Sequence, residues 1–378
     1  MILTDEQRQI RDVAREFSRR ELAPHAAARE EAAEIPRAVI DAMGALGFMG
    51  MTVPGEYDGA GADMVSYALA LMEIAAGDGA ISTVMSGHNS VGCSIVLQSG
   101  SDAQKERFLR PMATGKMLSC FALTEPSGGS DVAAMQSRAV RHGDGWRING
   151  RKQFITSGAI ADVAIIFAKT DPAAGRRGIS AFVVPTTTPG YRVGRREKKM
   201  GQNASDTVEL LFEDMDVPAD ALLGAEGEGM RIALSNLVGG RIGIAAQSVG
   251  MAREAMEKAI AYAKERTSFG VPIISHQAVA FRLADMAASL KAAEMLVLHA
   301  AALADAGEPC LTEASMAKLV ASETAEKVCS DAIQTFGGNG YVREYEVERI
   351  YRAVRVAKIY EGANDIQRLV ISRALAKG

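Results

Sequence analysis

The stretch GWRINGRKQFITSGAIADVAIIFAKT, residues 145–170, decides the fold class of this chain. Its segments 145–156 and 162–170 are short and strand-like, and Asn149-Gly150 is a turn signal. Similar segments lie on both sides of it: CFALTE at 120–125, SRAVRH at 137–142 and GISAFVVPT at 178–186. The pattern predicts a block of β-structure over about 116–225.

On both sides of this block, apolar residues recur with helical spacing. Thr4 can cap a first helix, with Gln7 three residues on in a capping-box relation. After the block, long segments rich in Ala and Met are expected to be helices near 230–266, 276–305, 312–335, 344–357 and 364–376. Helices, then strands, then helices favour an α+β protein over alternating βαβ units.

Size and charge restrict the class of protein. The chain has 378 residues and 48% apolar residues, enough for two or three domains with large cores. A formal charge of −4 gives no reason to expect nucleic acid or an anionic membrane as a partner. The N-terminus has no apolar signal core, and no run approaches 18 uncharged apolar residues, so we expect neither a signal peptide nor a membrane span.

Several common motifs are absent. The sequence has no GxGxxG after a strand, no GxxxxGK[ST], no GxSxG and no HExxH. The histidines are scattered and the cysteines are far apart, so we expect no metal site and a reducing compartment. The basic run 195–199 is either a solvated loop or an aid to attracting an anionic ligand.

Three segments need a further explanation, and each has two interpretations. TEPSGGSD at 124–131 is either a surface turn or a loop whose small residues let backbone N–H groups approach a ligand. QTFGGNGY at 334–341 either ends a helix with glycine or lets the backbone approach a dinucleotide.

The third segment, YEGANDIQR, begins at Tyr360. Gly362 should break one helix, and Asn364 can cap the next, with Gln367 completing a capping box. Glu361 then lies on a short joint between two helices. It is either a surface residue at a helix end or a carboxylate that points into a cavity.

Together these segments resemble the acyl-CoA dehydrogenase family over essentially the whole chain. The matching stretches also include KQFITSG at 152–158 and RTSFG at 266–270, followed by His276-Gln277. The short-chain and short branched-chain members are the most similar, because of GISAFVVPTTTPG at 178–190, GGRIGIA at 239–245 and IQRLVISR at 366–373.

The resemblance implies a fold and a cofactor. The fold is an N-terminal helical domain at 1–115, a middle β-barrel-like domain at 116–225 and a C-terminal helical bundle at 226–378. The cofactor is FAD, with part of its ADP half held by a neighbouring subunit. Flavin-ring and ribityl contacts would come from Phe121, Leu123, Thr124, Ser130, Phe154 and Thr156. The phosphate and adenine end would contact Arg266, Ser268, Gln277, Gln334, Gly337 and Gly338 across the subunit boundary, and Ala363 and Asp365 would touch FAD near the base.

The resemblance also implies the reaction, which is α,β-dehydrogenation of an acyl-CoA thioester to the trans-2-enoyl-CoA. Glu361 would abstract the α-proton, and the β-hydrogen would leave as hydride to flavin N5. The Glu361 N–H and a ribityl hydroxyl would stabilise the enolate-like oxygen. An apolar cleft should raise the pKa of Glu361. Substrate contacts would come from Ser130, Arg241, Tyr360 and Gly362.

The chain departs from the family pattern at three positions. Phe154 stands where many members have Trp, and Ala363 where Thr or Ser is frequent. Val238 replaces an Asp or Asn that contacts the acyl-CoA in many members, which leaves one substrate contact open. Segment 79–99, which borders the acyl pocket in relatives, has no Lys or Arg, and His88 is its only basic residue. We therefore expect a short or branched, uncharged acyl group.

Two other functions are compatible with such a fold: a flavin oxidase or monooxygenase, and a non-catalytic acyl-CoA-binding protein. A thioester base has little role in the first, and an intact base argues against the second. The family likeness further implies a homotetramer, an electron-transfer flavoprotein as electron acceptor, a cytoplasmic location, and a place in β-oxidation or in fatty acid or amino acid degradation.

Overall fold

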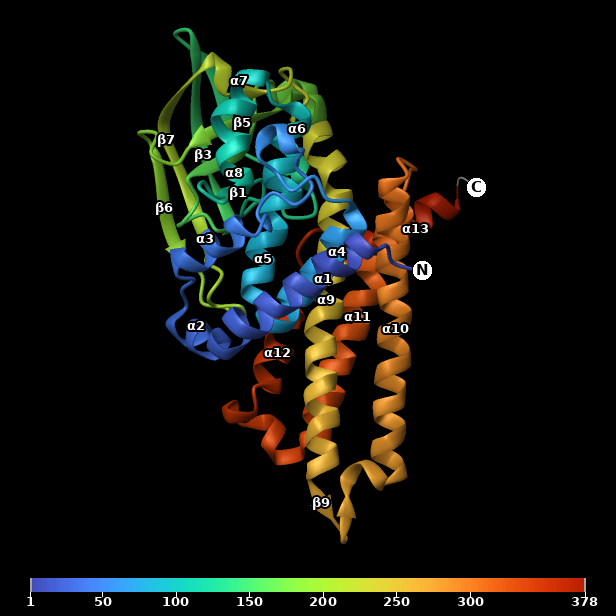
Figure 1. The fold of residues 1–378 in the computed structure, drawn as a ribbon. Coiled ribbons are helices and arrows are strands. Elements are labelled where there is room, and N and C mark those ends of the chain that lie inside the picture. The colour runs from blue at the N-terminus through green and yellow to red at the C-terminus, as the bar shows by residue number, and fades with distance from the viewer. Residues whose placement is uncertain (1, 377–378) are drawn as a thin grey trace.

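The chain runs from helices to strands and back to helices in the computed structural model, which describes residues 2–376 (Figure 1). The expected α+β order is therefore confirmed. The first helical region contains α1 (Asp5–Phe17), α2 (Ala26–Ala32), α3 (Arg37–Ala45), α4 (Met64–Gly77), α5 (Gly79–Gly87), α6 (Ser94–Ser99), α7 (Asp102–Gln104) and α8 (Arg110–Ala113). Thr4 and Gln7 form the predicted capping box at the start of α1.

The strands form one eight-stranded sheet. They are β1 (Ser119–Ala122), β2 (Arg138–His142), β3 (Gly145–Thr156), β4 (Val163–Lys169), β5 (Ile179–Pro185), β6 (Tyr191–Arg196), β7 (Thr207–Pro218) and β8 (Leu222–Leu223). Their order is β6-β7-β3-β2-β4-β5-β8, and β1 pairs with β4. Most pairings are antiparallel, but β1 and β2 run parallel to β4.

Strand β4 lies at the centre of this region and is buried on both faces. Ile165 and Phe167 belong to a core shared with the N-terminal helices, whereas Ala164 and Ile166 belong to a second core inside the sheet. This burial explains why the sequence of β4 is continuously apolar.

The predicted turn at Asn149-Gly150 is wrong. Both residues lie inside the continuous strand β3, where the register against β7 shifts between Ile148 and Gly150. A Cβ at Gly150 would lie 2.1 Å from the Ser137 hydroxyl. The glycine therefore permits a close backbone approach at a β-bulge.

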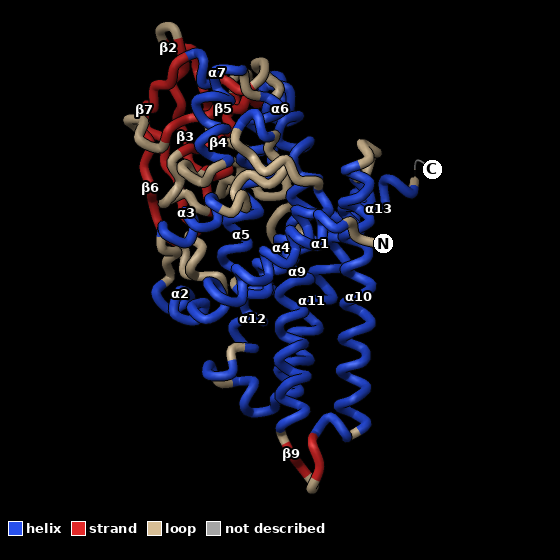
Figure 2. Tube along the Cα trace, viewed as in Figure 1, coloured by secondary structure: helices blue, strands red, loops and turns tan. Residues whose placement is uncertain are grey.

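The C-terminal helices form a long bundle that extends away from the sheet (Figures 1 and 2). Its helices are α9 (Gly229–Glu265), α10 (Gln277–Asp305), α11 (Leu311–Phe336), α12 (Val347–Val354) and α13 (Asn364–Leu375). A two-stranded hairpin, β9 (Thr267–Ser268) with β10 (Val271–Pro272), closes the far tip of the bundle. Helix α9 packs against both α4 and α11, so it joins the N-terminal helices to the bundle.

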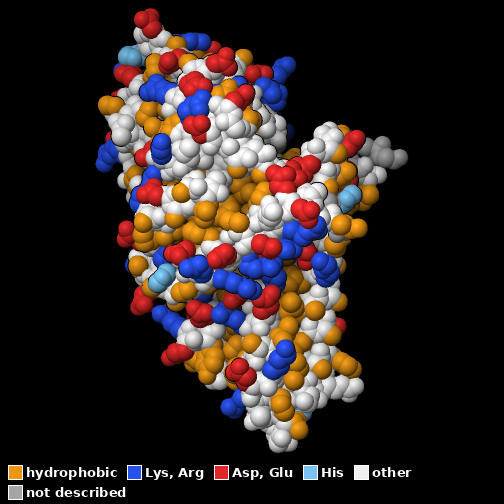
Figure 3. All heavy atoms as spheres, in the orientation of Figure 1, with side chains coloured by type: hydrophobic (Ala, Val, Ile, Leu, Met, Phe, Trp, Pro, Cys, Tyr) orange, Lys and Arg blue, Asp and Glu red, His pale blue; other side chains and the backbone are white. Residues whose placement is uncertain are grey.

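Helix α10 is long and apolar enough to cross a membrane by length and composition alone, with 39% of its most apolar window buried. Charged residues interrupt its apolar sequence, so it contains no run of 18 uncharged apolar residues. The helix packs along α9 and α11. Hydrophobic side chains such as Phe281 and Met295 remain exposed on it, and exposed apolar side chains are visible along the lower bundle (Figure 3).

Candidate active site

Glu361 lies on the expected joint between helices. The 3-10 turn Arg355–Lys358 precedes it, and α13 begins at Asn364. Glu361 has φ +53° and Gly362 has φ +86°, so two consecutive residues adopt the left-handed conformation. Glycine adopts it freely, but for a glutamate it is unfavourable and must be enforced by neighbouring groups.

The predicted capping box at Asn364 is wrong. Ala363 is the N-cap residue of α13, and its side chain makes no capping bond. The Asn364 Oδ1 atom instead accepts from Lys318 Nζ at 2.9 Å. The Gln367 Nε2 atom donates to the carbonyl oxygens of Glu361 and Gly362, at 3.3 and 2.7 Å. These amides therefore hold the joint and do not cap the helix.

The Glu361 carboxylate lies between α9 and α11. Its Oε2 atom is buried and has no hydrogen-bond partner among residues 2–376. Desolvation raises the pKa of Glu361 to about 7, against the lowering effect of Arg241 and Lys318. A Cβ at Gly240 would lie 2.5 Å from Oε2, so a larger residue on α9 would push the carboxylate out of this position.

Arg241 faces the carboxylate from α9 without forming an ion pair with it in the described part of the chain. Its Nη1 atom donates to the Ser315 hydroxyl at 3.1 Å, and its Nε is buried without a partner. Two buried polar atoms, Nε of Arg241 and Oε2 of Glu361, thus lack partners in the same region. A site that is completed by a polar ligand has this property.

Tyr360 belongs to a buried polar network between α5, α9 and the loop after β6. Its hydroxyl donates to Gln247 Oε1 at 2.6 Å, and Gln247 Nε2 donates to Thr83 Oγ1 at 2.5 Å. Thr83 in turn donates to Gln202 Oε1 at 2.5 Å. Nearby, a Cβ at Gly243 would lie 2.6 Å from the Ser86 hydroxyl. The Tyr360 hydroxyl is therefore hydrogen-bonded within a network of polar side chains without formal charge.

The six predicted flavin-ring and ribityl contacts come from two adjacent segments. Phe121, Leu123, Thr124 and Ser130 lie on β1 and the loop after it, whereas Phe154 and Thr156 lie at the end of β3. The Gln153 N–H donates to the Thr124 carbonyl at 2.9 Å, which joins the two segments. Phe154 has φ +57° at a second bulge of β3, and its side chain is 58% exposed.

An ion pair inside the β region holds the loop after β1. Lys152 Nζ donates to Glu125 Oε1 at 2.7 Å, and both side chains are buried. Glu125 also accepts from the N–H groups of Gln136 and Ser137. Burial raises the pKa of Glu125, but Lys152 and these N–H groups together lower it by more. The pKa of Glu125 is therefore below its ordinary value.

The remaining cofactor contacts were predicted at the tip of the bundle. Arg266, Ser268 and Gln277 lie around the hairpin, and Gln334, Gly337 and Gly338 lie at the end of α11. A Cβ at either Gly337 or Gly338 would meet nothing within 4 Å, so the backbone there is open to a ligand. Figure 1 shows this tip at the opposite end of the chain from the sheet. This separation is compatible with the predicted sharing of one FAD between two subunits.

His88 does not provide a charge for an acidic acyl group. It is buried, and burial lowers its pKa to about 4. The Ser119 N–H donates to its Nδ1 at 3.1 Å, so Nε2 carries the proton and donates to the Met112 carbonyl at 2.9 Å. His88 is therefore a neutral link between the helical region and β1.

Sequence reasoning did not select Lys318, Gln247 or Thr83. Lys318 is flanked on α11 by the small and apolar residues of 314–322, and a lysine in such a stretch is a usable signal. Arg176 and Arg177 were also not selected. They are exposed in the loop before β5, and Gly227, just ahead of α9, packs against the Arg177 carbonyl.

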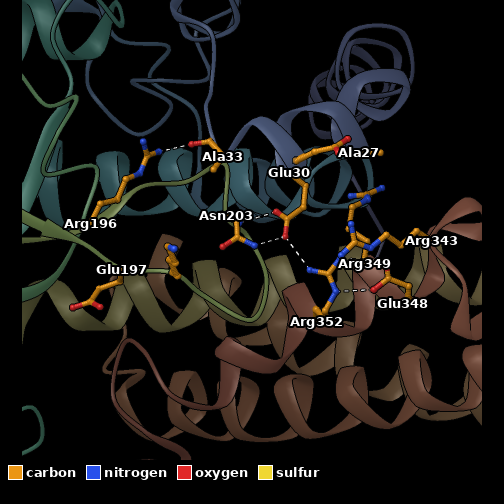
Figure 4. A pocket seen from close by; sticks show the side chains of 12 residues that line it. Ala27, Glu30, Ala33, Arg196, Glu197, Asn203, Arg343, Glu348, Arg349 and Arg352 are labelled. Carbon is orange, nitrogen blue, oxygen red and sulfur yellow. Dashed lines mark hydrogen bonds and ion pairs between the residues drawn. The ribbon is translucent and has the colours of Figure 1, made fainter.

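A cavity of about 630 Å³ lies elsewhere, between α2, the end of β6 and α12 (Figure 4). Glu30 accepts from Asn203 and pairs with Arg352 there, and Arg352 also pairs with Glu348. None of the predicted site residues lines it. Because it contains none of the predicted site residues, we assign no chemistry to this cavity.

Comparisons with known proteins agree along the whole chain. Family models match residues 4–116 (acyl-CoA dehydrogenase, N-terminal domain), 120–215 (middle domain) and 227–376 (C-terminal domain). An "acyl-CoA dehydrogenase" of Bacillus subtilis is 48% identical, with 100% of both chains covered. The "caffeyl-CoA reductase-Etf complex subunit CarC" of Acetobacterium woodii is 43% identical, again over 100% of both chains. The solved structure of butyryl-CoA dehydrogenase from Megasphaera elsdenii has a TM-score of 0.97 and 41% identity, and covers 100% of this chain and 99% of that one.

Proposed function

This chain belongs to the acyl-CoA dehydrogenase family, and from that premise we propose that Glu361 is the base that removes the α-proton of a short acyl-CoA thioester. The enzyme is an FAD-dependent oxidoreductase that forms a double bond between Cα and Cβ of the acyl group. The observation that carries the assignment is the buried, unpartnered Oε2 atom of Glu361 on a left-handed joint.

The environment of Glu361 suits a general base. A thioester α-hydrogen is weakly acidic, so the base must be desolvated and close to the proton. With a pKa near 7, Glu361 is ionised to a large extent at neutral pH and still has a strong tendency to take up a proton. The structure gives the Glu361 N–H no protein acceptor within the described residues, which leaves it free to bind the thioester oxygen.

The residues present fit FAD. Phe154 offers an exposed aromatic face beside Thr124 and Thr156, and Gly337 and Gly338 leave open backbone for a phosphate or adenine group. Bound FAD supplies the acceptor for the β-hydride. The chain itself binds the thioester, orients it and holds the α-proton on Glu361.

The network beside Tyr360 supports a short acyl group. Gln247, Thr83 and Tyr360 are hydrogen-bonded to one another, so a long acyl chain would have to break these bonds to extend between α5 and α9. Neither Lys nor Arg occurs in 79–99, and His88 is neutral, so this segment offers no cation to a second carboxylate of the acyl group. A four-carbon acyl group, like that of the butyryl-CoA enzyme, is the substrate we propose.

We further propose that Arg176 and Arg177 contact the phosphates of CoA. Helix α9 rises 1.5 Å per residue, so its start at Gly229 lies about 17 Å from Gly240 beside the base. The two arginines lie in the loop packed beside that start. An extended pantetheine arm running along α9 would bring its diphosphate towards them.

The relatives do not favour the flavin oxidase, the monooxygenase or the non-catalytic binding protein. We propose an electron-transfer flavoprotein as the electron acceptor, because a relative that is 43% identical to this chain is a subunit of an Etf complex. We also propose a homotetramer, supported by the two separated sets of FAD contacts. The family is one of soluble enzymes, and a cytoplasmic location is our proposal, in keeping with the four free, buried cysteines.

Replacement of Glu361 tests the assignment. The variant Glu361→Gln should bind FAD and butyryl-CoA like the parent, because Gln has nearly the same shape. It should slow flavin reduction by roughly 10²–10⁴-fold, the usual contribution of a positioned base. Anaerobic stopped-flow reduction with acyl-CoAs of graded length measures the rate and the chain-length preference together. Reduction within about threefold of the parent would reject Glu361 as the base.

A further inference from the structure

Lys318 lies fully buried directly behind the catalytic joint. Its side chain is 0% exposed, and its Nζ donates to the Gly362 carbonyl and to Asn364 Oδ1, both at 2.9 Å. Both acceptors are neutral, and no carboxylate forms an ion pair with Lys318 within residues 2–376. A buried ammonium without an ion pair is costly for the folded state. Its presence therefore calls for a reason other than stability.

The two acceptors indicate that reason. Gly362 follows the base directly in the chain, and Asn364 is the first residue of α13. Lys318 thus connects α11 to both sides of the joint. Gln367 holds the same Gly362 carbonyl from α13, and Ser322 of α11 bonds to Asn364.

The joint needs such restraint, because its backbone conformation is unfavourable. Glu361 is a non-glycine residue with φ +53°, and a relaxed chain would leave this conformation. A change in φ at Glu361 would move both its carboxylate and its N–H. The two groups that the reaction requires therefore depend on one backbone geometry.

We propose that Lys318 is the positioning residue of the active site: by holding the Gly362 carbonyl and Asn364, it fixes the left-handed joint that presents the Glu361 carboxylate and N–H to the thioester. The proposal rests on the role of Glu361 as base. Lys318 also contributes a positive charge close to that carboxylate. The other charged or titratable groups that face Glu361 are Arg241 on α9 and Tyr67 on α4, together with the adjacent Tyr360.

The test measures proton removal separately from hydride transfer. Acetyl-CoA has α-hydrogens but no β-hydrogen, so the holoenzyme can exchange its α-hydrogens with D₂O and cannot dehydrogenate it. Lys318→Met keeps the length of the side chain and removes its donors. Lys327→Met is the matched control, because Lys327 lies on the same helix, is exposed and pairs with Asp331.

We expect Lys318→Met to exchange about 100-fold more slowly than the parent, as a displacement of about 1 Å at a reacting group can cause. Its dissociation constant for acetyl-CoA and its FAD content should stay within about threefold of the parent values. The pH midpoint of exchange should move upward, because a cation that stabilises ionised Glu361 is lost. Lys327→Met should match the parent in every measurement.

Lys318→Gln is the second variant, and it decides the outcome where Lys318→Met does not fold. Its amide retains N–H donors, so it should recover part of the exchange rate while keeping the shifted pH midpoint. Exchange at the parental rate in folded Lys318→Met would overturn the proposal. Where Lys318→Met does not fold, exchange at the parental rate with an unshifted pH midpoint in Lys318→Gln would overturn it. Glu361→Gln separates the two assignments: if it exchanges normally, the base is wrong; if it does not and Lys318→Met does, only the positioning role is wrong.

Discussion

At the scale of single residues, the proposed active site contains one buried carboxylate, that of Glu361. Oε2 of Glu361 has no protein partner in the part of the chain that the structure describes, and Arg241 and Lys318 only partly offset the effect of burial on its pKa. Gly240 leaves room for this oxygen, because a side chain there would displace the carboxylate from its present position. The Glu361 carboxylate can therefore take up a proton near neutral pH, and it forms no ion pair with a residue that the structure describes.

This environment predicts a pH dependence of both rate and stability. The base must be ionised, so kcat/KM for butyryl-CoA should rise with pH and level off above about 7. The folded pKa is raised, so the folded state binds more protons than the unfolded state between the two pKa values, and Glu361 lowers stability as pH rises through that interval. Glu361→Gln should therefore increase Tm more at pH 8 than at pH 5. An equal gain at both pH values would contradict the raised pKa.

At the scale of elements, the β region holds its ligand-facing loop by a buried ion pair. Lys152 on β3 and Glu125 on the loop after β1 are both inaccessible, and Glu125 also fixes the backbone of Gln136 and Ser137. The loop between them carries Ser130 and follows Thr124. One pair therefore determines the path of several predicted FAD and substrate contacts.

Loss of one partner of this pair should be costly. Lys152→Met leaves the Glu125 carboxylate buried and unpaired, which should lower the free energy of unfolding by roughly 3–5 kcal/mol. Arg147→Met is the control on the same strand, because Arg147 pairs with Asp216 at the surface and should cost about 1 kcal/mol or less. Urea unfolding of the two variants provides the comparison. Equal losses would mean that the buried pair does not hold the loop.

The elements also show what the sequence could and could not predict. The expected strands at 145–156, 162–170 and 178–186 agree closely with β3, β4 and β5, because strand patterns are local. The turn at Asn149-Gly150 and the cap at Asn364 were wrong, because distant residues act there. Strand β7 pairs with β3 at Gly150 and keeps that segment in the strand. At Asn364, Lys318 of α11 donates to the side-chain oxygen that would otherwise cap the helix.

Within the site, the motifs located Glu361 and the predicted cofactor contacts, but the supporting network was missed. Lys318, Gln247 and Thr83 belong to no contiguous motif, and only the packing of α5, α9 and α11 brings them to the joint. The roles of the individual site residues and the domain boundaries near 115 and 225 remain predictions.

At the scale of the whole molecule, the two sets of predicted FAD contacts lie at opposite ends of the structure (Figure 1). The set around Phe154 belongs to the sheet, and the set around Arg266 belongs to the tip of the bundle. Exposed hydrophobic side chains such as Phe269 and Tyr341 lie near that tip, where another copy of the chain could cover them.

FAD occupancy and assembly should therefore be linked. A ligand that is bound only between subunits stabilises the assembled state. We expect removal of FAD to shift the tetramer towards smaller species, and Arg266→Ala to lower both FAD content and assembly although the sheet is unchanged. Light scattering combined with flavin absorbance measures both quantities. A fully flavinated monomer would contradict this arrangement.

The proposed sharing of FAD between the two separated sets has a genetic consequence. An allele damaged in the sheet and an allele damaged at the bundle tip would each encode an inactive homo-oligomer. In a cell that expresses both alleles, mixed pairs of chains form. In such a pair the intact tip of one chain meets the intact sheet of the other, and one complete cofactor site is restored. The opposite site of that pair combines both defects. Two recessive lesions in one gene would thus complement each other when they fall at opposite ends of the molecule, and would fail to do so when they fall at the same end.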